Sequence, residues 1–308
     1  MLITELLKEQ ENFSDSEKTI AKYLLEKRDE IRNLSSRALC NENFTTTSAL
    51  IRLCKKIGFK GYADFKEGFL KEIEYFNLYF DNIDVNKPFC QDENIMKISA
   101  IMSTLYQESA RDTLSLIEQD SLMEAVNILY TSKIIYVIST GIGLWAGESF
   151  KEKMLKIGRA VYVSNNFDFQ YYQCCNARKE DSYIVISYSG QNGKICQFVN
   201  ELKKKNARII GITSLGNNYL ANRSNAFLRM TTREKLYSNV SNYTSTNSTM
   251  LIMDILYSCL FSRDFEKNLE HKLKISKQFE RVRNSSNEIM KEDGCLYKIV
   301  DTTPQRGR

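Results

Sequence analysis

A run of small polar residues interrupts the second half of the chain, between an apolar run and a helical pattern. It reads Ser-Tyr-Ser-Gly-Gln-Asn-Gly over residues 187–193. Hydroxyl groups and free backbone N–H groups at the start of a helix bind anions, because partial positive charge gathers there. Gly190 would let the backbone approach a ligand closely. The run predicts a phosphate-binding turn, although an ordinary polar turn can have the same composition.

Residue types suited to catalysis or to metal binding are sparse. His271 is the only histidine and lies in a charged stretch, and the 8 cysteines show no CxxC spacing. We therefore expect no histidine-based triad, no catalytic residue, no metal ion and no cofactor. Cysteines without a disulfide framework are typical of reduced, mostly buried thiols, which favours a cytoplasmic protein. The apolar runs are too short to cross a bilayer, so no membrane partner is expected.

Positive charge gathers in one part of the N-terminal region. Residues 1–76 carry 13 basic and 13 acidic side chains, yet every charge between Glu42 and Asp64 is positive. A neutral domain with one basic face suits DNA binding, because phosphates must be met locally. A solvated helix face would show the same pattern.

Helical signals surround these basic residues. Residues 14–17 form a capping box before an apolar helical pattern, and a short second helix is predicted over 35–41. Thr46 is a plausible N-cap for a third helix ending near Ile57, where Gly58 can stop it. Asp64 is expected to cap a further helix. The third helix would enter the major groove, with base- and phosphate-contacting residues Thr46, Thr47, Ser48, Arg52, Lys55, Lys56 and Lys60.

The second half alternates strands with helices. Strands are predicted over 133–138, 160–163, 182–186, 207–213 and 226–230, and helices over 148–157, 169–176 and 194–205. This order predicts a parallel sheet with helices on both faces. Ligands then bind beyond the carboxyl ends of the strands.

The N-terminal pattern resembles the signature of the RpiR family of transcriptional regulators. The matching residues are 47–62, which contain Arg, two Lys and Ile-Gly-Phe-Lys-Gly-Tyr, followed by Asp-Phe-Lys at 64–66. The opening Ser-Glu-Lys-Thr-Ile-Ala-Lys-Tyr-Leu at 16–24 matches the same family. The resemblance implies a helix-turn-helix domain that binds double-stranded operator DNA.

Residues 181–214 resemble the core of the sugar isomerase (SIS) domain, whose signature is Ser-x-Ser-Gly-x-Thr-x-Glu. The resemblance implies that Ser187 and Ser189, beside Gly190, contact the phosphate of a bound sugar. Asn192 stands where the family usually has Thr. It can still donate a hydrogen bond, with a different geometry.

The first glycine turn departs further from the SIS pattern. Gly141 and Gly143 are kept, but Trp145 occupies the place of a serine. The missing phosphate hydroxyl is either lost or supplied by Ser139 or Thr140. The indole of Trp145 could stack on a sugar face, or it could be a packing residue.

Further departures bear on the ligand and on catalysis. Lys194 stands where relatives often have Glu, which would add positive charge near the anion, and Thr246 replaces a frequent Arg. The ligand therefore differs from that of better-matched relatives, or binding is weak. Sugar isomerisation needs a base such as Glu or His, and Glu148 is the only carboxylate near either glycine turn.

The predicted fold class is α/β, with an N-terminal all-α helix-turn-helix domain followed by a SIS-type parallel-sheet α/β sandwich domain. We expect the DNA-binding domain over 1–76, a linker over 77–93, the SIS domain over 94–265 and a charged helical tail over 266–308. The predicted function is transcription regulation controlled by a phosphorylated sugar, without enzyme activity. An isomerase-like enzyme and a SIS domain that has lost its ligand are the alternatives. A homodimer or homotetramer is expected, with helices 94–117 and 250–261 as candidate interfaces.

Overall fold

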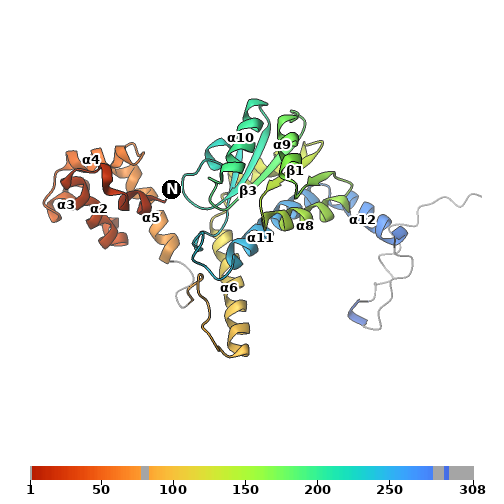
Figure 1. Ribbon diagram of the computed structural model, residues 1–308, viewed down its shortest axis with the longest axis horizontal. Helices are drawn as coiled ribbons and strands as arrows, with labels where there is room; N and C mark the ends of the chain where they lie inside the picture. Colours follow the sequence, from red (N-terminus) through yellow and green to blue (C-terminus); the bar gives the residue numbers. More distant parts are fainter. Residues whose placement is uncertain (1, 78–82, 280–287, 291–308) are drawn as a thin grey trace, which may run out of the picture.

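The computed structural model describes residues 2–77, 83–279 and 288–290. A helical domain precedes a domain built on a parallel sheet, and the two lie side by side (Figure 1). The elements of the helical domain are α1 (Ile3–Lys8), η1 (Gln10–Asn12), α2 (Asp15–Lys27), η2 (Arg28–Asn33), α3 (Ser36–Glu42), α4 (Thr47–Lys56) and α5 (Tyr62–Asn77).

Caps set the boundaries of these helices largely as predicted. The backbone N–H of Ser14 donates to the Glu17 carboxylate at 2.8 Å, which forms the capping box of α2. The Thr46 hydroxyl accepts from the N–H of Ala49 at 3.3 Å and begins α4. Gly58 has φ of 95°, in the left-handed region, and follows the end of α4. Asp64 does not cap α5, because the helix already begins at Tyr62.

One apolar cluster holds the helical domain together. Phe65, Phe69 and Ile73 repeat at four-residue spacing along α5 and are buried against Leu50 and Leu53 of α4. All buried members of this cluster lie between Ile3 and Ile73, so the domain has a core of its own.

The second domain contains a five-stranded parallel sheet with the order β2-β1-β3-β4-β5. The strands are β1 (Ile135–Ser139), β2 (Val161–Val163), β3 (Ser182–Ser187), β4 (Arg208–Thr213) and β5 (Ala226–Arg229). The helices are α6 (Ile95–Ser115), α7 (Gln119–Tyr130), α8 (Gly143–Leu155), α9 (Phe167–Cys175), α10 (Gly193–Lys204), η3 (Ala221–Arg223), α11 (Tyr243–Arg263), α12 (Phe265–Phe279) and η4 (Glu288–Met290).

Alternate residues of the strands enter two separate cores. Ile184 and Ile186 of β3 join a cluster with α7, α8 and α11, whereas Tyr183 and Val185 join one with α9 and α10. This alternation follows from the two-residue period of a strand. The prediction of a parallel sheet covered on both faces is therefore confirmed.

Two predicted helix boundaries were wrong. α8 begins at Gly143 rather than near Glu148, and α11 begins at Tyr243 rather than at Met250. Ile252 and Leu256 of α11 are buried in the domain core, whereas Leu251 and Ile255 of the same helix are half-buried, so a role for α11 at a subunit interface stays a prediction.

The predicted linker is partly docked, because Val85 and Pro88 are buried. α12 covers the first part of the predicted charged tail, and the rest lies mostly outside the described residues. None of the helices in the described part of the chain combines the length and apolar character that a bilayer crossing requires.

Candidate functional site

The exposed face of α4 carries most of the residues predicted to contact DNA. Thr46, Ser48, Arg52, Lys55 and Lys60 are exposed, on or beside the side of α4 opposite Leu50 and Leu53. Thr47 is half-buried. Two short helices, α3 and α4, are joined by a tight turn in which Phe44 has φ of 55°. The arrangement is that of a helix-turn-helix with α4 as the second, groove-facing helix.

A buried carboxylate that the charge pattern did not reveal lies beneath this face. The side chain of Glu17, on α2, is 1% exposed and lies 2.6 Å from the ammonium of Lys56 and 3.8 Å from Nε of Arg52. Lys56 also donates to the carbonyl of Asn12 at 2.9 Å. The ammonium of Lys56 is therefore fixed by two partners within the domain, Glu17 and the carbonyl of Asn12. Lys55, in contrast, has no carboxylate partner among the described residues.

Burial by itself raises the pKa of Glu17, but other contacts outweigh it. The Lys56 ammonium and the N–H of Ser14 both stabilise the charged form, and the pKa lies below its ordinary value. Glu17 is ionised at neutral pH and fixes the orientation of α4 relative to α2.

The second candidate site is a pocket of about 270 Å³ at the carboxyl ends of β1 and β3. Three segments enclose it: the turn after β1, the turn after β3, and the chain from the end of β5 to the start of α11. The sequence-predicted residues that line it are Ser139, Thr140, Gly141, Gly143, Ser187, Ser189 and Asn192. This is the position at which open parallel sheets bind ligands.

The turn after β3 offers several unpaired donors. Among the hydrogen bonds of the described residues, the hydroxyl protons of Ser187 and Ser189 have no acceptor, and neither do the backbone N–H groups of Ser189, Asn192 and Gly193. The side chain of Asn192 accepts from the N–H groups of Lys194 and Ile195, so it caps α10. Such a set of donors at a helix N-terminus suits an anion.

Gly190 shapes this turn without lining the pocket. Its φ of 61° is in the left-handed region, and an added Cβ would overlap the side chains of Asn218 and Thr213. The sequence predicted that Gly190 would let the backbone approach a ligand closely, and this stays a prediction. Its role in the structure is to let the turn pass close to the loop after β4.

The turn after β1 contributes less than the resemblance implied. Ser139 is fully buried and its hydroxyl donates to the carbonyl of Ile186 at 3.0 Å. Gln170 also bonds both backbone groups of Ser139. Thr140 is half-buried, and its hydroxyl proton has no acceptor among the described residues. Thr140 is therefore the better donor on this side of the pocket.

Three residues at which the sequence departs from the SIS pattern do not line the pocket. Trp145 is 75% exposed on the outer face of α8, so it is not placed to stack on a sugar in this pocket. The ammonium of Lys194 lies 3.9 Å from the centre of the Phe167 ring and does not line the pocket. The hydroxyl of Thr246 donates to the carbonyl of Asn242.

Sequence reasoning missed the third wall of the pocket. Lys235 and Leu236 line it from the chain after β5, and Asn242, Ser245 and Thr249 line it from the start of α11. Among the described residues, Lys235 has no carboxylate partner and is the only cationic residue in the lining. Lys235 lies in the loop beyond the carboxyl end of β5, which is the general position of ligand sites in parallel sheets, but no local pattern in the sequence singles it out.

A larger cavity of about 630 Å³ lies between the two domains. Apolar side chains such as Leu6, Phe59, Leu116 and Phe227 make up much of its lining. Within the described residues, it lacks the cluster of unpaired hydroxyl and N–H donors found at the strand ends. The smaller pocket is therefore the stronger candidate for a ligand site.

Comparisons with known proteins match the helical domain and the sheet domain to two different family models. Residues 1–74 match the helix-turn-helix domain of the rpiR family, and residues 128–258 match the SIS domain. An uncharacterised HTH-type transcriptional regulator of Clostridium perfringens is 24% identical over 84% of this chain and 91% of its own length. A similar regulator of Escherichia coli K12 is 22% identical over 83% and 90%.

Solved structures show the same fold. Vibrio vulnificus NanR, complexed with ManNAc-6P, superposes with a TM-score of 0.58 at 18% identity, covering 91% of this chain and 99% of that one. The sugar isomerase domain of a Sphaerobacter thermophilus RpiR transcription factor gives 0.52 at 14% identity, covering 59% and 99%. The chain therefore combines an rpiR-type helix-turn-helix domain with a SIS domain, and it is similar along most of its length to HTH-type transcriptional regulators.

Proposed function

We propose that this regulator binds operator DNA through α4 and that a phosphorylated monosaccharide in the 270 Å³ pocket changes its operator affinity. The observation that carries the proposal is the set of unpaired donors at the strand ends, in a chain that also has an exposed basic α4. The phosphate would accept from the hydroxyls of Thr140, Ser187 and Ser189. The N–H groups at the start of α10 would complete its coordination.

The size and charge of the pocket indicate the ligand class. At about 270 Å³ it lies near the lower limit for small-molecule sites, roughly 300–1,000 Å³, which favours one phosphorylated sugar ring over a disaccharide. Lys235 would supply positive charge opposite the turn after β3. Of the proteins with a similar fold, NanR is complexed with ManNAc-6P, which is itself a phosphorylated monosaccharide.

An isomerase-like activity is the alternative function. The residues that line the pocket argue against this activity. Within the described residues the lining contains no Asp, Glu or His to move a proton between sugar carbons. The nearby Glu234 carboxylate accepts from Thr244 and Ser245 at the start of α11, so it is already engaged. We propose that the protein binds its sugar phosphate without converting it.

The test begins with an operator selected from a random-sequence DNA library. DNA is then titrated with the protein in the absence and presence of ManNAc-6P, glucose 6-phosphate, arabinose 5-phosphate and the matching dephosphorylated sugars. We expect at least one sugar phosphate to change operator affinity by about 5- to 150-fold, and its dephosphorylated form to have little effect.

Ser189→Ala should weaken that response while leaving ligand-free DNA binding unchanged, because its hydroxyl lies in the other domain. An equal response in both proteins would show that the phosphate binds elsewhere. No response to any sugar phosphate would favour a SIS domain that has lost its ligand.

A further inference from the structure

The segment before α6, residues 83–90, is docked on the loop that forms the third wall of the pocket. We call residues 232–242 the pocket loop, since it connects β5 to α11 and includes Lys235 and Leu236. The docked segment turns at Asp84, whose carbonyl accepts from the N–H of Lys87 at 3.0 Å. Val85 and Pro88 are buried there. Only residues 78–82 separate this segment from α5 of the DNA-binding domain.

Asn86 makes the polar contacts between the two segments. Its side-chain oxygen accepts from the N–H of Lys235 at 2.7 Å, and its side-chain nitrogen donates to the carbonyl of Arg233 at 3.3 Å. Its own carbonyl accepts from the N–H of Val240 at 2.9 Å. These bonds lie on both sides of Lys235 and Leu236. A movement of this part of the loop toward a ligand would therefore strain or break the backbone bonds to Asn86.

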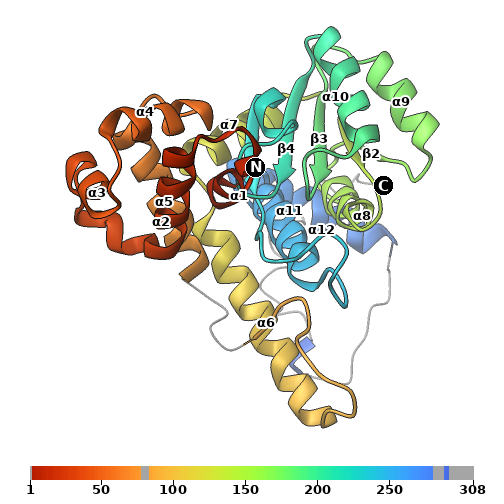
Figure 2. The same cartoon turned by 60° about the vertical axis from the view of Figure 1, so that its left-hand side comes forward.

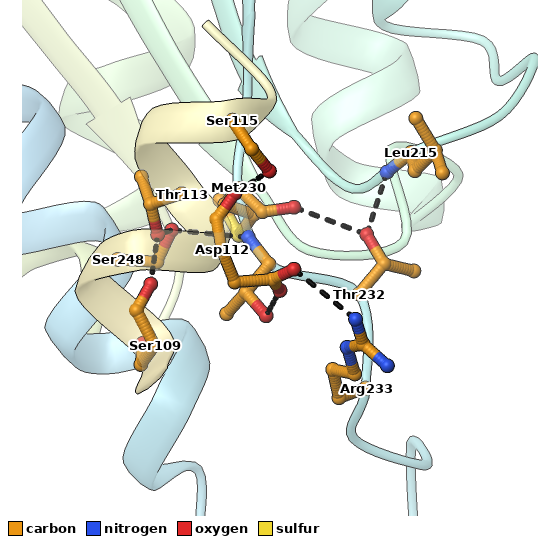
Figure 3. A network of polar contacts seen from close by, with 10 residues as sticks. Ser109, Asp112, Thr113, Ser115, Leu215, Met230, Thr232, Arg233 and Ser248 are labelled. Carbon is orange, nitrogen blue, oxygen red and sulfur yellow. Dashed lines mark hydrogen bonds and ion pairs between the residues drawn. The ribbon is translucent and has the colours of Figure 1, made fainter. Parts of the chain in front are cut away.

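Other contacts tie the same loop to the pocket and to α6. The hydroxyl of Tyr188, a pocket residue, donates to the carbonyl of Glu234 at 2.8 Å and accepts from its N–H at 3.0 Å. Arg233 forms an ion pair with Asp112 of α6 at 3.2 Å, with both side chains nearly inaccessible (Figure 3). The hydroxyl of Thr231 donates to the same carboxylate. The pocket loop thus contacts the pocket, α6 and the docked segment at once.

We propose that Asn86 is a positioning residue that transmits occupancy of the pocket to the segment leading from the DNA-binding domain. A ligand anion attracts the Lys235 ammonium, and the backbone N–H of the same residue is bonded to Asn86. Two arrangements of the loop then correspond to two arrangements of residues 83–90. Ligand and DNA affinities become linked through these two arrangements. The inference rests on the proposed function.

The experiment compares wild type, Asn86→Ala and Asn86→Asp as full-length proteins. Operator affinity is measured with and without ManNAc-6P, or with arabinose 5-phosphate if it gives the larger response in the wild type. Calorimetry measures sugar-phosphate affinity directly. Asn86→Ala removes both side-chain bonds, whereas Asn86→Asp keeps the acceptor for Lys235 and loses the donor to Arg233. Asn222→Ala, an exposed asparagine of η3 outside the pocket lining, is the matched control.

We expect Asn86→Ala to bind the sugar phosphate and the ligand-free operator within about threefold of wild type. The ligand should change its operator affinity less than about twofold, against about 5- to 150-fold in wild type and in Asn222→Ala. Asn86→Asp should be intermediate. By reciprocity, operator DNA should alter the sugar-phosphate affinity of wild type but not of Asn86→Ala, a result that a purely structural role would not produce.

Different outcomes separate this proposal from the proposed function. A wild type that binds the sugar phosphate without changing operator affinity overturns both. A normal response in Asn86→Ala overturns only the role of Asn86. Loss of sugar-phosphate binding in Asn86→Ala also overturns it, because Asn86 would then support the pocket itself.

Hydrogen exchange gives a test that needs no ligand. The amides of Lys235 and Val240 should be protected in wild type, and the Lys235 amide should exchange at least about tenfold faster in Asn86→Ala. Equal exchange of that amide in both proteins would show that the docked segment does not hold the loop in solution.

Discussion

Neighbouring lysines at the end of α4 have different surroundings. Lys55 is exposed and has no carboxylate partner among the described residues, whereas Lys56 is paired with Glu17 and the carbonyl of Asn12. An unpaired surface cation is free to neutralise a DNA phosphate. A cation paired with a buried carboxylate mainly stabilises the packing of α4 on α2. Charge counting along the sequence could not separate these roles.

Single substitutions of Lys55 and Lys56 should have different effects on DNA binding and on stability. Lys55→Ala should weaken binding to specific and random DNA alike and reduce the slope of log affinity against log salt by about 0.9, with no change in melting temperature. Lys56→Ala, in contrast, should lower the melting temperature, since it leaves a buried carboxylate without its nearest cation. Fluorescence anisotropy at several salt concentrations and thermal melts measure both effects. Equal melting temperatures for the two variants would contradict the assignment.

Arg52 remains the candidate for base recognition on the same helix. It is exposed, and its Nε lies 3.8 Å from Glu17, so the guanidinium is oriented without being buried. Arg52→Ala should cost about 1–3 kcal/mol of binding to the selected operator and much less on random DNA. Competition titrations with the two DNAs give this difference. A uniform loss would mean that Arg52 contacts only phosphate.

In the sheet domain, Lys235 is the pocket residue whose replacement should lower sugar-phosphate affinity most. Lys235→Gln removes the only cation that the described residues place in the lining, while keeping a hydrogen-bond donor. A hydrogen bond to a charged group contributes about 1.5–3 kcal/mol, so sugar-phosphate affinity should fall roughly 10-fold or more. Ligand-free operator binding should not change. Calorimetry checks the first expectation, and Lys194→Gln serves as a control because Lys194 lies over Phe167 outside the pocket.

Among the helices, the junction of α2 and α4 depends on one ionised side chain. The contacts of Glu17 lower its pKa in the folded protein relative to its ordinary value of 4.5. A group with a lowered pKa stabilises the fold at pH values above that ordinary value. The contribution is lost as the pH falls through the pKa of the folded state.

Wild type and Glu17→Gln should therefore differ most in stability near neutral pH. The difference in free energy of unfolding should shrink as the pH falls below 4.5, where the carboxylate of the wild type becomes protonated. Urea unfolding of both proteins from about pH 7 to about pH 3 measures it. A difference that stays constant with pH would show that the charge of Glu17 does not stabilise the fold.

Elements defined by local signals were predictable from the sequence, and those defined by tertiary partners were not. Thr46 capped α4 as predicted, and the β-branched runs became the five strands. The start of α11 was missed because its first residues are polar. Thr244 and Ser248 are buried there, bonded to Glu234 and to Thr113 of α6. Those partners lie 10 and 135 residues away in sequence, so no local pattern reveals them.

The candidate pocket was predictable to a similar extent. The turns after β1 and β3 carried motifs and were found. The pocket loop was not, because Lys235 and Leu236 belong to no regular pattern and reach the pocket only through the return of the chain after β5. The sequence left stacking on a sugar and packing both open for Trp145, which lies exposed on α8, outside the lining of this pocket.

The helix α6 leaves the body of the sheet domain and extends downward in Figure 2. Ile95 and Met96 at its free end are 80% and 75% exposed. A helix-turn-helix reader usually binds two half-sites related by two-fold symmetry. We therefore expect a dimer or tetramer in which this end of α6 contacts a second copy of the chain.

Replacing both residues, Ile95→Glu with Met96→Glu, should lower the mass of the assembly. Light scattering at micromolar concentration measures it, with Phe169→Glu as a control for adding charge at another exposed apolar position on α9. A monomeric wild type would contradict the assembly. An unchanged mass in the double variant would exclude this end of α6 as the interface.

The geometry of α6 gives the molecule a lever arm. Its carboxyl-terminal part is fixed to the body by Ser109, Asp112 and Thr113, and Asp112 pairs with Arg233 of the pocket loop. At about 1.5 Å per residue, Ile95 lies roughly 25 Å along the helix from Asp112. A rotation of about 6° at the fixed end would displace the far tip by about 2.5 Å. A sub-ångström shift of the pocket loop next to a bound ligand would thereby become a displacement at the tip of α6. That displacement would be comparable with the contact distances between two protomers.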